Sequence, residues 1–221
     1  MQSPHRSRTR NRLIGAVVLV VLVVAMALNT KFLTPAEVAA IAPKPFDPAA
    51  IATDLYARAG DELPDRAQPL GEVVPALQAD VAAAAEKYDA TSPASKSYVF
   101  PVELTGTVTE ATDASLRLQV DGVPAQTPVI IPLSTAVNGT VIRDLMGFKF
   151  ADAPGQTGYQ YVGDELKKLM LASIESSVPD PAALEGKKVT VVGALGVQAT
   201  GSTVPRAKPL NVQPLSIEAG S

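Results

Sequence analysis

The sequence predicts an α+β protein with an N-terminal membrane helix, a short helical region, and a small five-stranded antiparallel barrel that carries one inserted helix. Three observations support this fold class. An unbroken apolar run comes first, apolar residues at helical spacing follow, and apolar residues then alternate with polar ones. The expected parts are a cytoplasmic basic segment (1–12), a transmembrane anchor or signal (13–28), a helical region with a linker (29–97) and the barrel domain (98–221).

Residues 13–28, LIGAVVLVVLVVAMAL, are sixteen apolar residues without interruption. A helix satisfies its own backbone hydrogen bonds in hydrocarbon, so this segment is expected to enter the membrane. Four arginines precede it without any acidic residue, and they should stay on the cytoplasmic side. Everything after Asn29 is therefore expected outside the cytoplasm. The arginines are Arg6, Arg8, Arg10 and Arg12.

The length of the apolar run is compatible with either a membrane-spanning helix or a cleavable signal peptide. A spanning helix needs about 17 to 25 residues, and a cleavable signal has an apolar core of about 7 to 15. Ala25-Met26-Ala27 matches the small-x-small cleavage pattern, but no polar stretch precedes the cut. We therefore favour a single-pass anchor in the cell membrane with an extracytoplasmic C-terminal domain. The alternative is a secreted or periplasmic protein cleaved after Ala27.

Composition excludes several kinds of chemistry. The chain has no Cys, no Trp and a single His, His5, in its extreme N-terminal segment. Thiol catalysis, disulfides and Cys/His metal sites are therefore excluded, and no serine of the folded region has a histidine to activate it. We expect no enzyme activity, no catalytic residue, no bound metal and no cofactor.

Charge argues against a nucleic-acid partner. The formal net charge of −3 averages two unlike regions, because 15 basic residues face 22 acidic ones from Asn29 onward, a net charge of −7. A phosphate-binding surface needs clustered Lys and Arg, and the basic pairs here are only 167–168 and 187–188. The oligomeric state is not indicated.

Helix start signals recur in the region before residue 90. Thr34-Pro35-Ala36-Glu37 forms a capping box for a short helix that Pro43 should end. Asp47-Pro48 starts a second helix, expected to stop at Gly60. A third helical pattern follows Pro75. Residues 61–71 are interpreted as a loop and residues 90–97 as a linker, since both are rich in turn-forming or polar residues.

The strands follow the linker. Alternation predicts strands at 102–109 and 116–120, and a third apolar run at 129–133 contains Pro132, which suggests an edge position or a bulge. An inserted helix with an apolar stripe at 166–174 precedes two further strands at 188–195 and 210–217. This order matches the oligonucleotide/oligosaccharide-binding (OB) barrel. The alternative is an open antiparallel sheet packed on the helical region.

Residues 138–150 are the richest candidate binding segment. Arg143 is suited to a carboxylate or polar ligand, and Asn138 and Asp144 to hydroxyl groups, as in sugar sites. Thr140 completes the candidate binding set. The alternative, which we favour, is structural: Arg143 and Asp144 cap and solvate a short helix whose apolar residues plug the barrel. Those apolar residues are Val141, Ile142 and Leu145.

Tyr159 and Tyr161 form an i, i+2 aromatic pair. On an extended segment the two rings would share one face and offer a stacking platform for a sugar ring. The favoured alternative is that both rings pack on a sheet with their hydroxyls outward.

Five segments together resemble a known family: KPFDPAAIATDLYA, VELTGTVTE, NGTVIRDLMGFKF, YQYVGDELKKLM and GKKVTVVGAL. They are similar to the bacterial predicted periplasmic lipoproteins designated domain of unknown function 2291. Members are often encoded beside ribose-type ABC sugar transporters, so the resemblance implies an extracytoplasmic accessory role in sugar uptake and possible ABC transporter partners, without implying a reaction. This chain lacks the Cys that would carry lipid. The expected function is an anchored, non-catalytic accessory or interaction module; the alternative is a small-ligand, carbohydrate-like binding domain.

Overall fold

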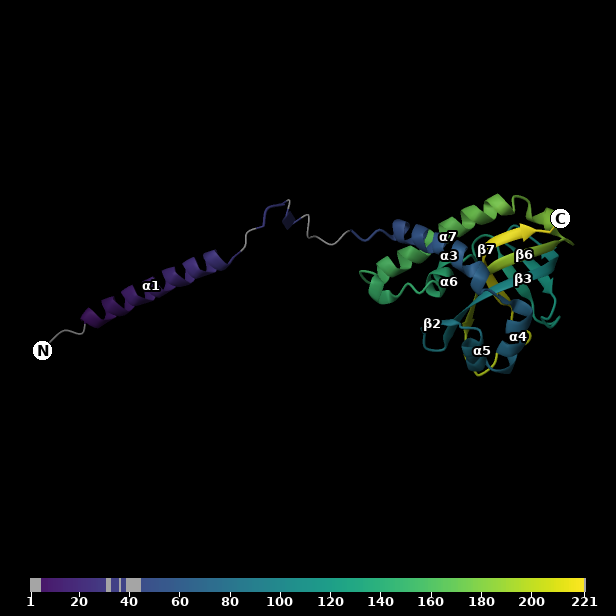
Figure 1. The fold of residues 1–221 in the computed structure, drawn as a ribbon, viewed down its shortest axis with the longest axis horizontal. Helices are drawn as coiled ribbons and strands as arrows, with labels where there is room; N and C mark the ends of the chain where they lie inside the picture. The colour runs from purple at the N-terminus through teal and green to yellow at the C-terminus, as the bar shows by residue number, and fades with distance from the viewer. Residues whose placement is uncertain (1–4, 31–32, 36, 39–44, 221) are drawn as a thin grey trace. The chain divides into compact units, whose positions relative to one another are not determined.

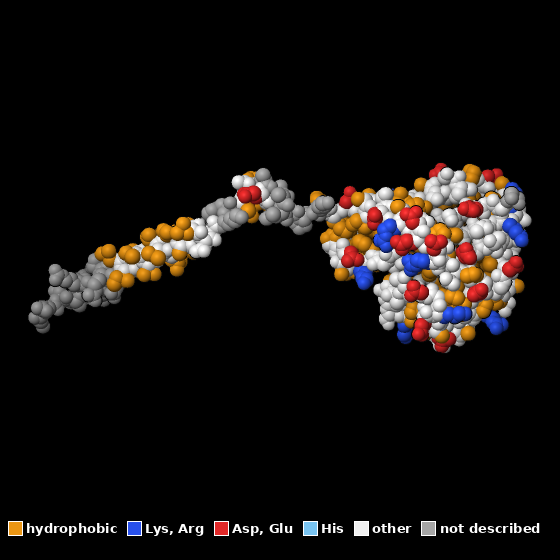
Figure 2. All heavy atoms as spheres, viewed as in Figure 1, with side chains coloured by type: hydrophobic (Ala, Val, Ile, Leu, Met, Phe, Trp, Pro, Cys, Tyr) orange, Lys and Arg blue, Asp and Glu red, His pale blue; other side chains and the backbone are white. Residues whose placement is uncertain are grey.

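A computed structural model of the chain describes residues 5–30, 33–35, 37–38 and 45–220. The chain divides into two units, Met1–Pro45 and Phe46–Ser221, which are described separately below. The first unit contains helix α1, His5–Asn29 (Figure 1). Its window Arg12–Asn29 has a mean hydropathy of 2.4 and no residue buried inside protein, and hydrophobic side chains run along the helix in Figure 2. By length and composition α1 is able to cross a membrane, and the prediction of an N-terminal apolar helix is confirmed.

The predicted capping box after α1 is also confirmed. The backbone N–H of Thr34 donates to Glu37 Oε2 at 2.8 Å, and the N–H of Glu37 donates to Thr34 Oγ1 at 3.3 Å. The bond from the Thr34 backbone N–H, and next a bond from the Thr34 hydroxyl to Glu37 Oε2 at 2.9 Å, lower the pKa of the Glu37 carboxyl group. The predicted end of this helix at Pro43 lies outside the described residues.

The second unit begins with helix α3, Pro48–Arg66, whose N-terminus is capped by the side chain of Asp47. The prediction that this helix stops at Gly60 and that a loop covers 61–71 is wrong. Leu63 is fully buried in the core, and Glu62 pairs with an arginine one turn before it and one turn after it. Core burial therefore carries the helix past Gly60, and Pro64 is tolerated in its last turn.

The third predicted helix is in fact two helices, α4 (Leu70–Ala79) and α5 (Val81–Lys87). Asp80 separates them because its backbone is extended and its side chain accepts a hydrogen bond from the N–H of Ala83. Pro75 lies inside α4 rather than before it. The predicted linker is also wrong in part, since four of its residues form strand β2, Thr91–Ala94.

The five predicted strands are confirmed. They are β3 (Ser97–Ala111), β4 (Ser115–Val120), β5 (Val129–Pro132), β6 (Lys188–Gln198) and β7 (Leu210–Ala219). With β2 and the two-residue β1, Gln68–Pro69, they form one seven-stranded sheet. Neighbours follow the order β1-β3-β4-β5-β7-β6, and β6 also pairs with β3 along eleven residue pairs.

The sheet is mixed, so the prediction of a purely antiparallel sheet is wrong. β5 pairs with β7 in parallel, and β1 pairs with β3 in parallel. The reason is geometric, because a circuit of five paired strands, β3-β4-β5-β7-β6 and back to β3, cannot alternate direction at every step. Pro132 is the last residue of β5, where it pairs with Ser115 of β4 but has no partner in β7, which pairs with β5 only at Val129 and Ile130. The predicted edge position therefore holds locally, and the ladder with β4 contains no bulge.

The segment between β5 and β6 is helical. It contains α6 (Gly139–Leu145), the 3-10 turn η1 (Phe150–Asp152), α7 (Gln156–Ser177) and the 3-10 turn η2 (Pro181–Leu184). α7 contacts α3, α6 and β7, and Figure 1 shows α3 and α7 side by side against the strands. α7 begins ten residues before the predicted apolar stripe, and this longer helix changes the surroundings of both candidate tyrosines.

Candidate functional site

Arg143 on α6 is the centre of the richest polar cluster in the folded unit. Its side chain is only 6% exposed. Nε and Nη2 donate to Asp144 Oδ1 at 2.9 and 2.7 Å, and Nη1 donates to the backbone carbonyl of Tyr159 at 2.8 Å. The expectation that Arg143 solvates a short helix is therefore wrong, because the guanidinium is buried and joins α6 to the first turns of α7.

Asp144 balances this buried charge. Its Oδ1 accepts the two bonds from Arg143 and a third from the Tyr159 hydroxyl at 2.9 Å. Within the described residues Oδ2 accepts no hydrogen bond, and the side chain keeps 17% of its surface exposed. Burial first, and then the hydrogen bond to Asp144, raise the pKa of Tyr159 above its usual value.

Three aromatic rings extend the cluster. The Arg143 guanidinium carbon lies 3.5 Å from the centroid of the Tyr159 ring, a cation–π contact. Phe148 stacks near-parallel to Tyr159 with ring centroids 6.0 Å apart, and Phe150 meets Tyr159 edge-on at 5.7 Å. Phe150 is nevertheless 56% exposed. The cluster therefore combines a buried ion pair with an aromatic ring that is fixed at one edge and open to solvent.

The tyrosine pair does not form a shared platform. Both residues lie on helix α7, not on an extended segment, so their side chains point to different sides of the helix. Tyr159 contacts the buried arginine, whereas Tyr161 is 54% exposed. The expectation of an extended segment is wrong because apolar residues of α7 pack into the core from its first turns, including the buried Val162.

Asn138 and Thr140 serve the start of α6. Asn138 Oδ1 accepts from the Thr140 N–H at 3.1 Å and from its hydroxyl at 2.7 Å, and the Asn138 N–H donates to Gln213 Oε1 at 2.7 Å. The expected apolar plug is partly present, since Ile142 and Leu145 are buried. The structure thus brings together Arg143, Asp144 and Tyr159, and it places the other three candidates outside that cluster.

A cleft of about 730 Å³ opens beside the cluster. One wall is the edge strand β2 with the adjoining ends of β3 and β6, and the other is the segment from Arg143 to Ala151 with Tyr159. Sequence reasoning did not select Phe148, Lys149 and Phe150 as candidate site residues, although their aromatic-cation-aromatic pattern was a usable signal. It also had no means of placing Ser92 and Gln198 opposite them.

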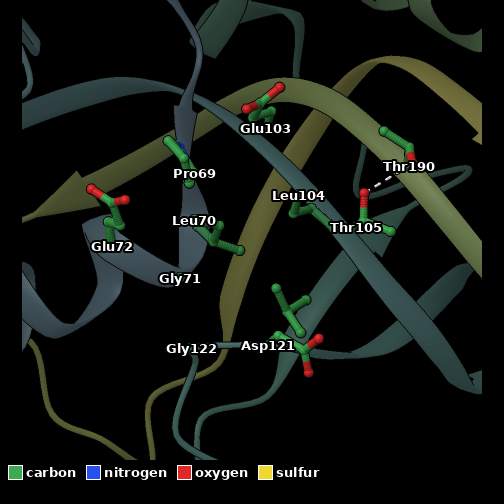
Figure 3. Close-up of a pocket in the computed structure, with 11 residues that line it drawn as sticks. Pro69, Leu70, Gly71, Glu72, Glu103, Leu104, Thr105, Asp121, Gly122 and Thr190 are labelled. Carbon is green, nitrogen blue, oxygen red and sulfur yellow. Dashed lines mark hydrogen bonds between the residues drawn. The ribbon is translucent and has the colours of Figure 1, made fainter.

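A second cavity of about 400 Å³ lies between α4, β3 and the turn after β4 (Figure 3). Three carboxylates line it, but Figure 3 shows Glu72, Glu103 and Asp121 pointing in different directions. In the part of the chain that the structure describes, no group of three His, Cys, Asp or Glu residues is placed to hold a metal ion. The hydroxyls of Thr105 and Thr190 meet at 3.0 Å in this cavity, but its carboxylates do not converge, so the cleft beside Arg143 is the stronger candidate site.

The fold resembles a solved structure. A crystal structure of an OB-fold protein from Thermotoga maritima superposes with a TM-score of 0.66 at 17% sequence identity, covering 80% of this chain and 100% of that chain. This likeness supports the predicted OB-like fold and carries no function. No curated protein matches the chain.

A family model confirms the resemblance seen in the sequence. The model described as predicted periplasmic lipoprotein (DUF2291) matches residues 17–218, which is nearly the whole chain. The match includes most of the apolar run, all the strands and the Arg143 cluster. The protein therefore belongs to the DUF2291 family of predicted periplasmic lipoproteins.

Proposed function

We propose that the protein is a non-catalytic accessory module of ABC-type sugar uptake, held at the outer face of the cytoplasmic membrane by α1. One observation carries the tether: the Arg12–Asn29 window of α1 has a mean hydropathy of 2.4, and Phe46–Ser221 forms a folded unit of its own. A helical window with no polar face is suited to hydrocarbon.

α1 attaches the folded unit to the membrane, as a covalently bound lipid does in a lipoprotein. The family is described as predicted lipoproteins, and lipid would be carried by a cysteine, which these 221 residues lack. An uncleaved α1 keeps the folded unit next to the membrane by another means. The link to sugar uptake rests on the family resemblance, because its members are often encoded beside sugar transporters.

The absence of catalysis is proposed from composition. The single histidine is His5, and there is no cysteine, so Ser–His and Cys–His nucleophile–base pairs cannot form within Phe46–Ser221. The buried Arg143–Asp144 pair resembles structural ion pairs, since each partner is hydrogen-bonded to the other at 2.7 Å.

Crosslinking in native membranes tests the accessory role. The full chain with a C-terminal tag would be crosslinked in its own cells, purified and analysed by mass spectrometry. The matched control is residues 1–45 fused to an unrelated soluble domain, which keeps the tether and removes the folded unit. We expect enrichment of a sugar-transport permease or binding protein over the control. Equal recovery with both chains would contradict the proposal.

A second candidate function is the binding of a small, carbohydrate-like ligand. The observation that favours it is the cleft beside Arg143, whose volume lies in the range of about 300 to 1,000 Å³ typical of ligand sites. The two functions are compatible, because an accessory module of sugar uptake that recognises the transported compound performs both.

A further inference from the structure

We infer that the cleft between β2 and the segment 147–151 binds one neutral, polyhydroxylated ring, which stacks on Phe150 while one of its hydroxyls donates a hydrogen bond to Asp144 Oδ2. This inference rests on the second candidate function and names its ligand class and contact residues. It replaces the tyrosine pair, which the sequence suggested as the stacking platform, by a phenylalanine on the neighbouring turn η1.

Phe150 is a pre-organised stacking surface. Its ring is held edge-on by Tyr159 at 5.7 Å with an interplanar angle of 70°, yet more than half of its surface is exposed. An exposed aromatic ring that lines a cleft suits the apolar face of a ligand ring. Tyr159 is less suitable, because Arg143 and Phe148 already lie against its ring.

The charges of the cleft favour a neutral ligand. Arg143 is matched by Asp144 at 2.7 Å, and the guanidinium already occupies the cation–π position over Tyr159. For a cationic ligand, the charge of Asp144 is already neutralised by Arg143, and the face of the Tyr159 ring is already occupied. An anionic ligand would meet Lys149, but this side chain is exposed to solvent, so it attracts an anion only weakly. The charge of Arg143 is already neutralised by Asp144. Neither charged class finds a buried, unmatched partner in the cleft.

Polar groups on both walls suit hydroxyls. Asp144 Oδ1 is saturated by three donors, and Oδ2 is the oxygen left to accept a further bond. On the opposite wall Gln198 Nε2 donates to Ser97 Oγ at 2.9 Å, which leaves its amide oxygen for a ligand donor, and Ser92 lies beside them. The carboxylate oxygen of Asp144 and the amide oxygen of Gln198 can each accept a hydrogen bond from a hydroxyl of a ligand ring that stacks on Phe150.

Ligand-observed NMR tests the inference with defined probes. The full chain, in a detergent without a sugar headgroup, would be mixed with D-glucose, D-galactose, D-xylose or myo-inositol, and saturation transfer to the probe measured. Gluconate and glucosamine serve as the anionic and cationic comparisons. We expect transfer to at least one neutral probe, exceeding that to both charged ones.

Variants locate the site. Phe150→Ala should weaken binding of that probe at least about tenfold, which corresponds to about 1.4 kcal/mol. Phe150→Tyr, which keeps the aromatic ring, should still bind that probe. Tyr161→Ala is the matched control, since it removes an equally exposed aromatic from α7 and should leave binding unchanged. Melting temperatures of the three variants should stay close to that of the unaltered chain, with a small fall only for Phe150→Ala, which loses the edge contact with Tyr159.

Three outcomes would overturn the inference. They are no binding of any neutral probe, stronger binding of gluconate or glucosamine, and equal binding by Phe150→Ala and the unaltered chain. None of these outcomes bears on the accessory role in sugar uptake, which the crosslinking experiment tests independently.

Discussion

The guanidinium of Arg143 is bound twice by Tyr159, once by the face of its ring at 3.5 Å and once by its backbone carbonyl at 2.8 Å. The two residues are sixteen positions apart and belong to different helices, α6 and α7. This contact fixes the turn that carries Phe150, because both ends of the intervening segment are held by one side chain. The same contact gives the first prediction.

Arg143→Ala should lower the free energy of unfolding by about 3 to 5 kcal/mol, because it leaves the carboxylate of Asp144 without its buried partner. Arg117→Ala is the matched control, since its pair with Glu110 is 48% and 59% exposed and should be worth about 0 to 1 kcal/mol. Urea unfolding of the full chain in detergent measures both. Similar losses for the two variants would contradict a structural role of Arg143.

Gly139→Ala should destabilise the contact between α6 and α7. A Cβ at this position would lie 2.2 Å from the carbonyl oxygen of Gly163 and 2.4 Å from the backbone nitrogen of Lys167, and backbone atoms cannot move aside. We expect a loss of at least about 1 to 3 kcal/mol, as for overpacked cores. Gly60→Ala is the control, because its Cβ would meet nothing within 4 Å in helix α3 and should stabilise by about 0.5 to 1 kcal/mol. A Gly139→Ala chain with unchanged unfolding would show that the helices are not packed as described.

Tyr159 should ionise at higher pH than an ordinary tyrosine, because its hydroxyl is partly buried and donates to Asp144. A pKa raised in the folded state means that this stabilisation is complete below about pH 10, the unfolded value, and is lost as pH rises through the folded pKa. Tyrosinate absorbance against pH measures it. The late-titrating fraction should disappear in Tyr159→Phe, and its persistence there would assign it to another of the five tyrosines.

The mature chain should keep its N-terminus, with α1 in the membrane and the C-terminus outside. The reason is that the apolar run continues through the small-x-small pattern at Ala25 and Ala27 without a polar break. Intact-mass spectrometry of the protein from membranes decides this. An N-terminus at Leu28 would show that the segment is a cleaved signal.

Residues 29–221, expressed alone, should be soluble and folded without metal. The unit Phe46–Ser221 has its own buried core, and the sequence of this fragment contains no Cys or His. The melting temperature should be the same with and without a chelator. A large fall in chelator would reveal a carboxylate metal site.

Patterns within single elements predicted much of the fold. Strand β4 and the middle of β3 follow from alternation, because buried residues there alternate with more exposed ones. The end of α3 did not follow, since Gly60 and Pro64 are local signals for a turn while the burial of Leu63 against distant residues overrides them. Of the candidate site, Arg143 and Asp144 were found as neighbours in sequence, but Phe150 was not selected.

The sequence by itself determined the apolar N-terminal helix, the order along the chain of the five predicted strands and the family, because these depend on composition, period and motif along one stretch of chain. Only the tertiary structure decided that β5 and β7 run parallel, that Tyr159 lies under Arg143, and that β2 faces Phe150 across a cleft. Each of these relationships joins residues on separate elements. Their meeting is set by how the helices and the strand circuit pack together, which periodicity in one segment does not encode.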